Sequence, residues 1–377
     1  MKRRLSNRVH VGRVAVGGGA PVSVQSMTNT RTSDADATLA QIRELAALGC
    51  DIIRCAVPDM PSAEAMRRIV AESPIPVIAD IHFDWRLALA SIRAGVHGVR
   101  INPGNIGGAD RVRAVAEAAG EAGIPIRVGA NTGSLPKGLF ESKLAACGDH
   151  DEAMAEALCD AVGEQICTLE SCGFHNIKVS LKASSVPVMV AAYRKFAARS
   201  PYPLHLGVTE AGTTSRGILK SAAGIGALLL DGIGDTIRVS LTAPPREEVK
   251  AGIALLEVCG LRDAYPEIVS CPTCARTEYD LIGMASRVEE LVASLKASGR
   301  RIGLKKIAVM GCVVNGPGEA KDADFGLAGS KNGFVALFRK GVPFANLPQE
   351  EAFEALREEI LSSSPDAEDD AAGGEKT

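Results

Sequence analysis

Three of the ten cysteines in this 377-residue chain have a spacing that suits a metal centre. Cys271 and Cys274 form a C-x2-C pair, and Cys312 follows after 37 residues. The pair alone fits zinc, a redox disulfide or an iron–sulfur cluster. Three thiolates leave a [4Fe–4S] cluster one ligand short, and Glu319, seven residues after Cys312, is the candidate for the fourth position. A ligand of that kind is displaceable, which suits a cluster that must bind substrate.

The other cysteines lie in predicted helices or strands, where we expect small packing residues rather than ligands. These are Cys50, Cys55, Cys147, Cys159, Cys167, Cys172 and Cys259.

A second set of reactive side chains stands at the ends of predicted strands, where burial would favour apolar residues. Five of them are cationic, and we expect them to converge on something anionic because an unpaired buried guanidinium is costly. Arginine suits phosphate oxygens, so a diphosphate is the expected ligand. Asp80 and Glu210 are too few to neutralise them, and Glu210 is also a candidate proton donor. The candidate substrate-binding residues are Arg54, Asp80, His82, Arg100, Asn102, Arg127, Asn131, Lys182, Arg238 and Ser240.

Eight short β-branched runs, with helical stretches between them, must position these side chains. The alternation predicts parallel strands joined by right-handed crossovers, and eight units in about 240 residues predict an α/β fold, a (β/α)8 TIM barrel. The active site of such a barrel lies at the C-terminal strand ends. Residues 9–16 predict a hairpin that caps the opposite end. The predicted strands are 22–27, 52–57, 76–81, 98–101, 125–128, 177–181, 204–208 and 236–241.

The pattern changes near Pro266, which predicts a small second α+β domain that carries the cysteine centre. We expect the substrate-binding barrel at 1–265 and the cluster domain at 266–361. Within the latter, the sequence predicts helices at 278–297 and 350–361 and strands at 306–310 and 333–339. Residues 362–377 hold five acids and one lysine, which predicts a disordered tail.

Composition narrows the function classes. The formal net charge of −3 comes from the acidic tail, and the nearly neutral body argues against nucleic-acid binding. No apolar run is long enough for a membrane span, and no secretory signal follows the basic N-terminus, so we expect a cytoplasmic protein. Ten cysteines in a reducing compartment favour ligands and packing residues over disulfides.

The motifs resemble one known family. Cys-Pro-Thr-Cys-Ala-Arg at 271–276 and Gly-Cys-Val-Val-Asn-Gly-Pro-Gly-Glu at 311–319 are similar to the IspG (GcpE) family of 4-hydroxy-3-methylbut-2-enyl diphosphate synthases, in its compact bacterial form. Barrel segments such as Ala-Asp-Ile-His-Phe at 79–83 and Gly-Val-Thr-Glu-Ala-Gly at 207–212 extend the resemblance over nearly the whole chain.

The resemblance implies a reductive ring opening of 2-C-methyl-D-erythritol 2,4-cyclodiphosphate in the non-mevalonate isoprenoid pathway. It implies a [4Fe–4S] cluster on Cys271, Cys274, Cys312 and Glu319, with Glu319 leaving when substrate binds, and Glu210 as the active-site acid. It also implies reduced flavodoxin or ferredoxin as electron donor, and a homodimer in which one subunit's cluster domain closes over the other's barrel. The residues that match the family's diphosphate-binding set are Arg54, Arg100, Arg127, Asn131, Lys182, Arg238 and Ser240.

Two other hypotheses fit parts of the pattern. A barrel transferase similar to dihydropteroate synthase would also bind a diphosphate but would need no cluster. Alternatively, the C-terminal unit is a zinc-type binding module on an inert barrel.

Overall fold

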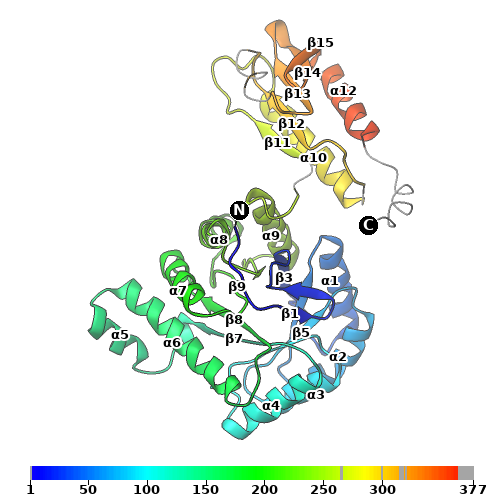
Figure 1. The fold of residues 1–377 in the computed structure, drawn as a ribbon. Helices are drawn as coiled ribbons and strands as arrows, with labels where there is room; N and C mark the ends of the chain where they lie inside the picture. The colour runs from blue at the N-terminus through cyan, green and yellow to red at the C-terminus, as the bar shows by residue number, and fades with distance from the viewer. Residues whose placement is uncertain (1, 264–265, 299, 314–317, 319–320, 364–377) are drawn as a thin grey trace, which may run out of the picture. The chain divides into compact units, whose positions relative to one another are not determined.

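The computed structural model describes residues 2–263, 266–298, 300–313, 318 and 321–363. The chain divides into two units, Met1–Arg262 and Asp263–Thr377 (Figure 1). The boundary that the sequence predicts, after residue 265, falls at residues 264–265, which lie outside the described part. The predicted acidic tail lies outside it from residue 364 onward.

Eight parallel strands form the centre of the first unit, in the sheet order β8-β7-β6-β5-β4-β3-β10-β9. A parallel bridge between Val179 and Leu204 joins β8 to the residue before β9, so the sheet nearly closes on itself. This confirms the predicted TIM barrel. The strands are β3 (Ser23–Met27), β4 (Ile52–Ala56), β5 (Val77–Asp80), β6 (Val99–Arg100), β7 (Ile126–Asn131), β8 (Ile177–Lys182), β9 (His205–Leu206) and β10 (Thr236–Ile237).

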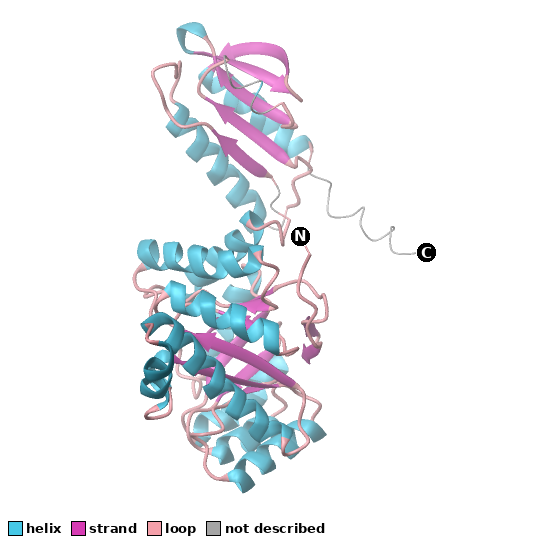
Figure 2. Cartoon of the chain, turned by 60° about the vertical axis from the view of Figure 1, so that its left-hand side comes forward, coloured by secondary structure: helices cyan, strands magenta, loops and turns pink. Residues whose placement is uncertain are grey.

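Helices surround these strands (Figure 2). Several begin where an aspartate caps the first turn: Asp34, Asp59, Asp84 and Asp149 each accept a hydrogen bond from a backbone N–H of their helix. The sequence did not predict α5 or α9. The helices are α1 (Ala35–Ala47), α2 (Met60–Glu72), α3 (Trp85–Arg93), α4 (Ala109–Glu121), α5 (Leu139–Cys147), α6 (His150–Glu170), α7 (Val186–Arg199), α8 (Thr214–Leu230) and α9 (Pro245–Val258).

The predicted hairpin forms from β1 (Val9–Val11) and β2 (Val14–Val16). Val9, Val11 and Val16 pack against Ile52 and Ile78, which stand near the starts of β4 and β5. The hairpin therefore covers the N-terminal end of the barrel and leaves the C-terminal strand ends for a site.

The second unit contains a five-stranded sheet in the order β11-β12-β13-β14-β15. Strands β11, β12 and β13 are parallel, whereas β14 and β15 continue antiparallel. Apolar residues of α10 and α12 form one core with β12, β13 and β14. The elements are β11 (Glu267–Ser270), α10 (Leu281–Ala297), β12 (Lys306–Met310), β13 (Phe325–Gly329), β14 (Phe334–Arg339), β15 (Val342–Pro348) and α12 (Gln349–Ser362).

In the described part of the chain, none of the helices combines the length and the apolar character that crossing a membrane requires.

Candidate active site at the barrel mouth and a cysteine centre in the second unit

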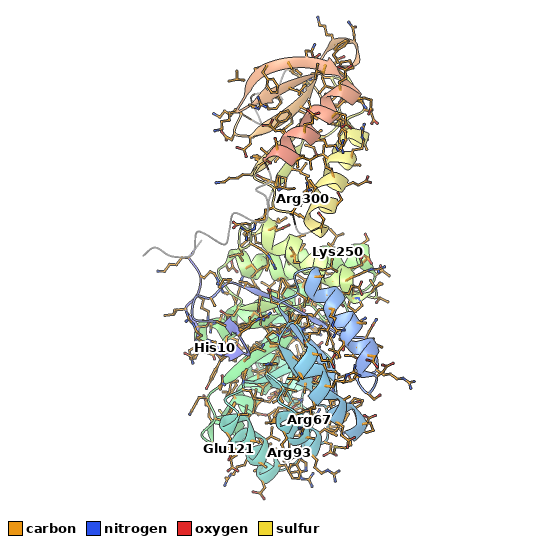
Figure 3. All side chains as sticks on the ribbon, turned by 90° about the vertical axis from the view of Figure 1, so that its right-hand side faces the viewer. His10, Arg67, Arg93, Glu121, Lys250 and Arg300 are labelled. Atoms are coloured by element: carbon orange, nitrogen blue, oxygen red, sulfur yellow. The ribbon has the colours of Figure 1, made fainter. Side chains whose placement is uncertain are left out.

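The alternation of side chains along β8 shows how the barrel interior becomes cationic. Ile177, Val179 and Leu181 belong to the apolar core. Lys178 and Lys182 alternate with them and are buried as well, so their side chains face the interior of the barrel. By contrast, charged residues of the outer helices, such as Arg67 and Glu121, are exposed at the surface (Figure 3).

Asp80 joins arginines from two neighbouring strands. Its Oδ2 lies 3.3 Å from Arg54 Nε, and its Oδ1 lies 3.3 Å from Arg100 Nη1. His82 reaches the same carboxylate, with Nε2 4.0 Å from Oδ1. Burial acts to raise the pKa of Asp80, but Arg54 and Arg100 outweigh it and lower that pKa below its usual value. Asp80 is therefore an ionised bridge between two cations.

Arg127 makes a different contact. Its Nη1 donates to the Ser180 hydroxyl at 3.0 Å on the adjacent strand β8. Burial, together with repulsion from Arg54 and Arg100, lowers the pKa of Arg127. Gly129 makes room for this contact, because a Cβ at that position would collide with the Ser180 side chain.

Lys182 and Arg238 complete the cation cluster. Burial, then repulsion from Arg127 and Arg238, lowers the pKa of Lys182. A Cβ added at Gly207 would lie 2.9 Å from Lys182 Nζ, so that glycine gives the lysine its space. Arg238 Nη2 lies 3.3 Å from Glu248 Oε2 on α9.

Glu248 is a site residue that sequence reasoning missed. It is buried, pairs with Arg238 and accepts a hydrogen bond from the Leu241 backbone N–H at 2.9 Å. The sequence analysis instead counted Glu210 with Asp80 as the carboxylates among the cations. Glu210 is exposed and forms no ion pair within the described residues. The signal that would have located Glu248 is a carboxylate in the first turn of the helix that follows β10, seven residues beyond Leu241.

The arginines of the mouth keep unused donors. The Nε atoms of Arg54, Arg127 and Arg238 are buried and have no hydrogen-bond partner in the described part of the protein. The Arg54 Nε contact with Asp80 is an ion pair without hydrogen-bond geometry. Buried donors left without partners are rare, so these atoms suit an anionic ligand.

The remaining predicted site residues lie near the mouth, and the described side-chain contacts do not join them to the cation cluster. Asn131 ends β7, and Ser240 stands two residues after Arg238, both half-buried. Asn102 uses its side-chain oxygen to accept a hydrogen bond from the Gly104 N–H at 3.1 Å, which stabilises a turn.

Glu210 follows β9 with a backbone φ of 52°, in the left-handed region that a glutamate seldom adopts. Such strain concentrates at functional sites. This conformation favours a role for Glu210 in the chemistry over a structural role as an ion-pair partner.

In the second unit, two of the predicted ligand cysteines lie on neighbouring strand ends. Cys271 directly follows β11, and Cys312 follows its parallel neighbour β12 by two residues. The Gly311 N–H donates to Cys271 Sγ at 3.1 Å. The third cysteine belongs to a turn that is attached to β12, because the Cys274 carbonyl accepts from the Thr277 N–H and the Gly311 carbonyl accepts from the Glu278 N–H.

The electrostatics of these thiols fit a thiolate centre. Hydrogen bonds from the Arg276 backbone and side chain lower the pKa of Cys274. The N–H bond to Cys271 Sγ is the kind of contact that tunes cluster thiolates. Among the described residues, no three His, Cys, Asp or Glu side chains already form a group that holds a metal. Glu319 lies outside the described residues.

The seven cysteines that were expected to be packing residues differ in their burial. Cys50, Cys55, Cys159 and Cys259 are buried, as expected for packing residues. Cys172 is half-buried and packs against the barrel core, which also agrees with the expectation. Cys147 and Cys167 are exposed, so the packing expectation was wrong for these two, because α5 and α6 present them to solvent.

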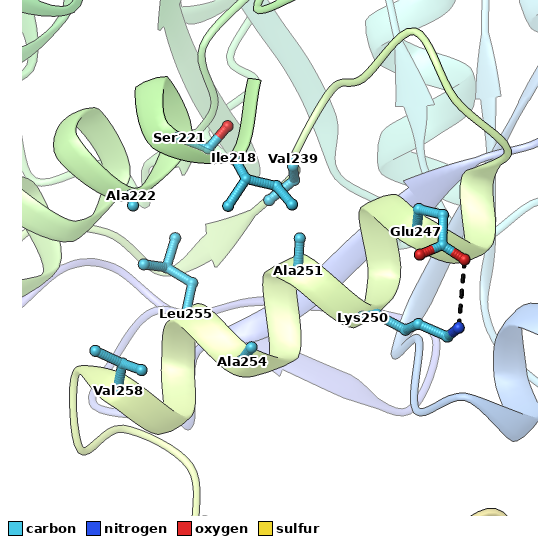
Figure 4. Close-up of a pocket in the computed structure, with 10 residues that line it drawn as sticks. All are labelled: Ile218, Ser221, Ala222, Val239, Glu247, Lys250, Ala251, Ala254, Leu255 and Val258. Carbon is cyan, nitrogen blue, oxygen red and sulfur yellow. Dashed lines mark hydrogen bonds and ion pairs between the residues drawn. The ribbon is translucent and has the colours of Figure 1, made fainter. Parts of the chain in front are cut away.

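A cavity of about 370 Å³ lies away from this chemistry, between α8 and α9 (Figure 4). Its lining is largely apolar and includes Ile218, Ala251 and Leu255, with the Lys250–Glu247 ion pair of 3.3 Å at one end. None of the mouth cations lines it. The chemistry of the mouth, rather than this cavity, identifies the candidate active site.

Comparison with known proteins matches both units. The family model described as the GcpE TIM-barrel domain matches residues 6–253, and the GcpE protein C-terminal domain matches residues 267–362. Curated relatives named 4-hydroxy-3-methylbut-2-en-1-yl diphosphate synthase (flavodoxin) include that of Dehalococcoides mccartyi strain CBDB1, 51% identical over 96% of this chain and 99% of the relative. That of Geobacter sulfurreducens is 50% identical over 94% of this chain and 97% of its own.

Among solved structures, the dihydropteroate synthase of Yersinia pestis matches 67% of this chain and 97% of its own, with a TM-score of 0.48 and 12% identity. No functional argument follows from similarity at that level.

Proposed function

The chain belongs to the GcpE family, and we propose that it catalyses the formation of 4-hydroxy-3-methylbut-2-en-1-yl diphosphate, the product for which its relatives are named. The proposed substrate is 2-C-methyl-D-erythritol 2,4-cyclodiphosphate. One carbon–oxygen bond to the diphosphate breaks, a hydroxyl leaves as water, and two electrons are consumed. The observation that carries the substrate assignment is the buried cation cluster at the barrel mouth, for which the carboxylates of the described residues are too few to neutralise the charge.

In this proposal the mouth binds the diphosphate. The unpartnered Nε donors of Arg54, Arg127 and Arg238 supply charge-assisted hydrogen bonds to its oxygens. Lys182 adds a point charge. Asp80 holds Arg54 and Arg100 in place, with His82 beside it. Arg100, Asn131 and Ser240 complete the diphosphate set, and Asn102 stays a prediction.

The cysteine centre would hold the cofactor. Cys271, Cys274 and Cys312, with Glu319, are the proposed ligands of a [4Fe–4S] cluster. When bound, the cluster supplies single electrons and an iron position open to substrate. The lowered pKa of Cys274, which favours its thiolate form, supports this donor set, and so does the Gly311 N–H that donates to Cys271 Sγ.

Glu210 is the proposed proton donor, and protonation of the departing hydroxyl is its step. Its exposure and its strained backbone four residues after β9 support this role, since segments that follow barrel strands line the end of the barrel where substrates bind. A proton placed on the hydroxyl oxygen lets that group leave as neutral water.

The electron donor that we propose is reduced flavodoxin, which the relatives' names specify; reduced ferredoxin is the second candidate. We further propose a cytoplasmic homodimer in which the cluster domain of one subunit serves the barrel of the other. Support for this comes from the chain itself, because the cation cluster and the cysteine centre lie on separate units.

The test is an anaerobic assay of protein reconstituted with iron and sulfide, using the cyclodiphosphate and a one-electron reductant. The expected result is brown protein that forms the allylic diphosphate, and loss of colour and product with Cys312→Ser. Full activity of a colourless preparation would refute the cluster mechanism. One zinc and no iron per chain would instead favour the zinc-module hypothesis, and membership of the GcpE family argues against the transferase.

A further inference from the structure

Lys178 is a buried cation that the proposed chemistry does not use. It occupies the inward position two residues before Ser180 on β8, with only 1% of its surface exposed. Its Nζ is buried and has no hydrogen-bond partner in the described part of the chain. A fully buried ammonium without a partner is costly, and such a group usually loses its charge instead.

Charged and titratable groups of four barrel strands, β4, β7, β8 and β9, surround Lys178. Arg127 on β7 and Arg54 on β4 act on it electrostatically, and both are cations. His205 on β9 and Lys182 on β8 belong to the same interior group, because the pKa of His205 is lowered by burial and then by Arg127, Lys182 and Lys178. His205 is therefore neutral, and these neighbours offer Lys178 no negative charge.

Asp235 is the carboxylate that acts on Lys178, and it is already occupied. Its Oδ1 accepts from the Ser6 hydroxyl at 2.8 Å, and its Oδ2 accepts from the Leu204 N–H at 2.8 Å. Arg3 and Arg4 also approach it, at 3.5 and 4.0 Å. Because Asp235 already balances these cations at the N-terminal end of the barrel, it does not serve as a dedicated partner for Lys178.

When no anion is bound, the surroundings of Lys178 therefore disfavour a positive charge on its side chain. Burial first, and then repulsion from Arg127 and Arg54, lowers its pKa to about 7. A diphosphate bound by Arg127 and Lys182 would offset the positive field of these cations with its own negative charge, and the pKa of Lys178 would then rise.

We propose that Lys178 is a positioning residue for the diphosphate, uncharged in the free enzyme and protonated from solvent when the diphosphate binds. The proton balances part of the ligand charge and forms no bond with the substrate. This inference rests on the proposed function, because it needs a diphosphate at the mouth. The protonated Lys178 would add a positive charge deeper in the barrel than the residues that contact the ligand.

Calorimetric titration of the full-length protein with inorganic pyrophosphate tests this without any cluster. Titrations at pH 8 in two buffers of different ionisation enthalpy give the number of protons taken up on binding. Lys178→Met removes the titrating group, and Lys250→Met is the matched control because Lys250 is exposed on α9. Free pyrophosphate has the same protonation state in every titration, so the protons it carries before binding cancel in the comparison.

The wild type and Lys250→Met are expected to take up nearly one proton more per site than Lys178→Met. At pH 7, the wild type should bind pyrophosphate more tightly than Lys178→Met does, about tenfold for each unit by which the pKa of Lys178 rises on binding. The two affinities should converge near pH 10. Lys182→Met should weaken binding yet keep the extra proton. If Lys178→Met does not fold, Lys178→Gln takes its place.

Equal proton numbers and an affinity ratio independent of pH would overturn the inference while leaving the proposed mouth intact. Proton uptake that disappears only in Lys182→Met would reassign it to Lys182 and equally overturn it. If folded wild-type protein and both variants bind no pyrophosphate at all, the proposed diphosphate site itself fails, and the inference fails with it.

Discussion

Replacing Asp80 with asparagine tests whether the mouth is built around one ionised carboxylate. Asp80 is 3% exposed and lies 3.3 Å from both Arg54 and Arg100. With an effective dielectric constant near 20, each pair is worth about 5 kcal/mol of attraction. Loss of the charge returns several kcal/mol of carboxylate desolvation, so the expected net destabilisation is about 3 kcal/mol.

Urea unfolding followed by Trp85 fluorescence measures this change. Trp85 is the sole tryptophan and begins α3, so its signal reports on the barrel alone. With an m value of about 3 kcal/mol/M, the transition midpoint of Asp80→Asn should fall by about 1 M. Asp36→Asn is the matched control, because Asp36 forms an exposed ion pair with Arg68 and should leave the midpoint unchanged.

The same variant makes two linked predictions. Pyrophosphate should still bind, because the anion replaces the missing countercharge, and at a hundredfold excess over its Kd it should restore about 2.7 kcal/mol. The pKa of Asp80 is lowered in the folded protein, so its contribution is present above the unfolded value of about 3.9 and is lost as the pH falls through the folded value. The gap between wild type and variant should therefore close in acid. A midpoint equal to that of Asp36→Asn at pH 7 would refute the bridging role of Asp80.

Three further predictions concern other parts of the chain. Arg238→Ala should weaken pyrophosphate binding by about 2–3 kcal/mol in calorimetry through loss of charge-assisted bonds, whereas Arg246→Ala on the outer helix should not; equal affinities would place Arg238 outside the site. Gly129→Ala should destabilise the barrel by about 1–3 kcal/mol in urea, because the new methyl collides with Ser180, and Ser180→Ala in the same chain should recover part of that loss; an unchanged midpoint would contradict the close contact. Cys274→Ser should lower the iron content after reconstitution while the Trp85 transition stays unchanged; full iron content would remove that thiol from the ligand set.

The barrel itself was predictable because its signal is local. Each β-branched run followed by an amphipathic stretch predicts one βα unit, and strands of a closed parallel barrel must share one C-terminal end. The arginines at those ends could therefore be grouped before any coordinates. In the second unit, β11, β13 and β15 escaped prediction: β11 is short and partly exposed, β13 contains two glycines, and β15 is partly exposed and contains two prolines.

The partners of the cations were not predictable in the same way. Glu248 reaches Arg238 only because α9 folds back over the end of β10, and the sequence analysis assigned no helix to that segment. The depth of Lys178 was hidden for a different reason. Alternation of polar and apolar residues is the usual pattern of a strand with one face in water, and only closure of the barrel places the polar face of β8 inside.

Closure of the barrel explains why the same buried cations both destabilise the free protein and bind the anion. Most barrels fill their interior with bulky apolar side chains, whereas this one buries Arg54, Arg127, Lys178 and Lys182. Within the described residues, Asp80 and Glu248 are the buried carboxylates that form ion pairs with the cations of the mouth. The remaining positive charge stays uncompensated in the free protein, so an anion that enters the mouth stabilises the fold at the same contacts by which it is bound. Lys182→Met, which removes a cation that faces the mouth, should then make the free barrel more stable in urea and its diphosphate complex weaker in calorimetry, a pair of opposite effects that a purely structural role for Lys182 does not produce.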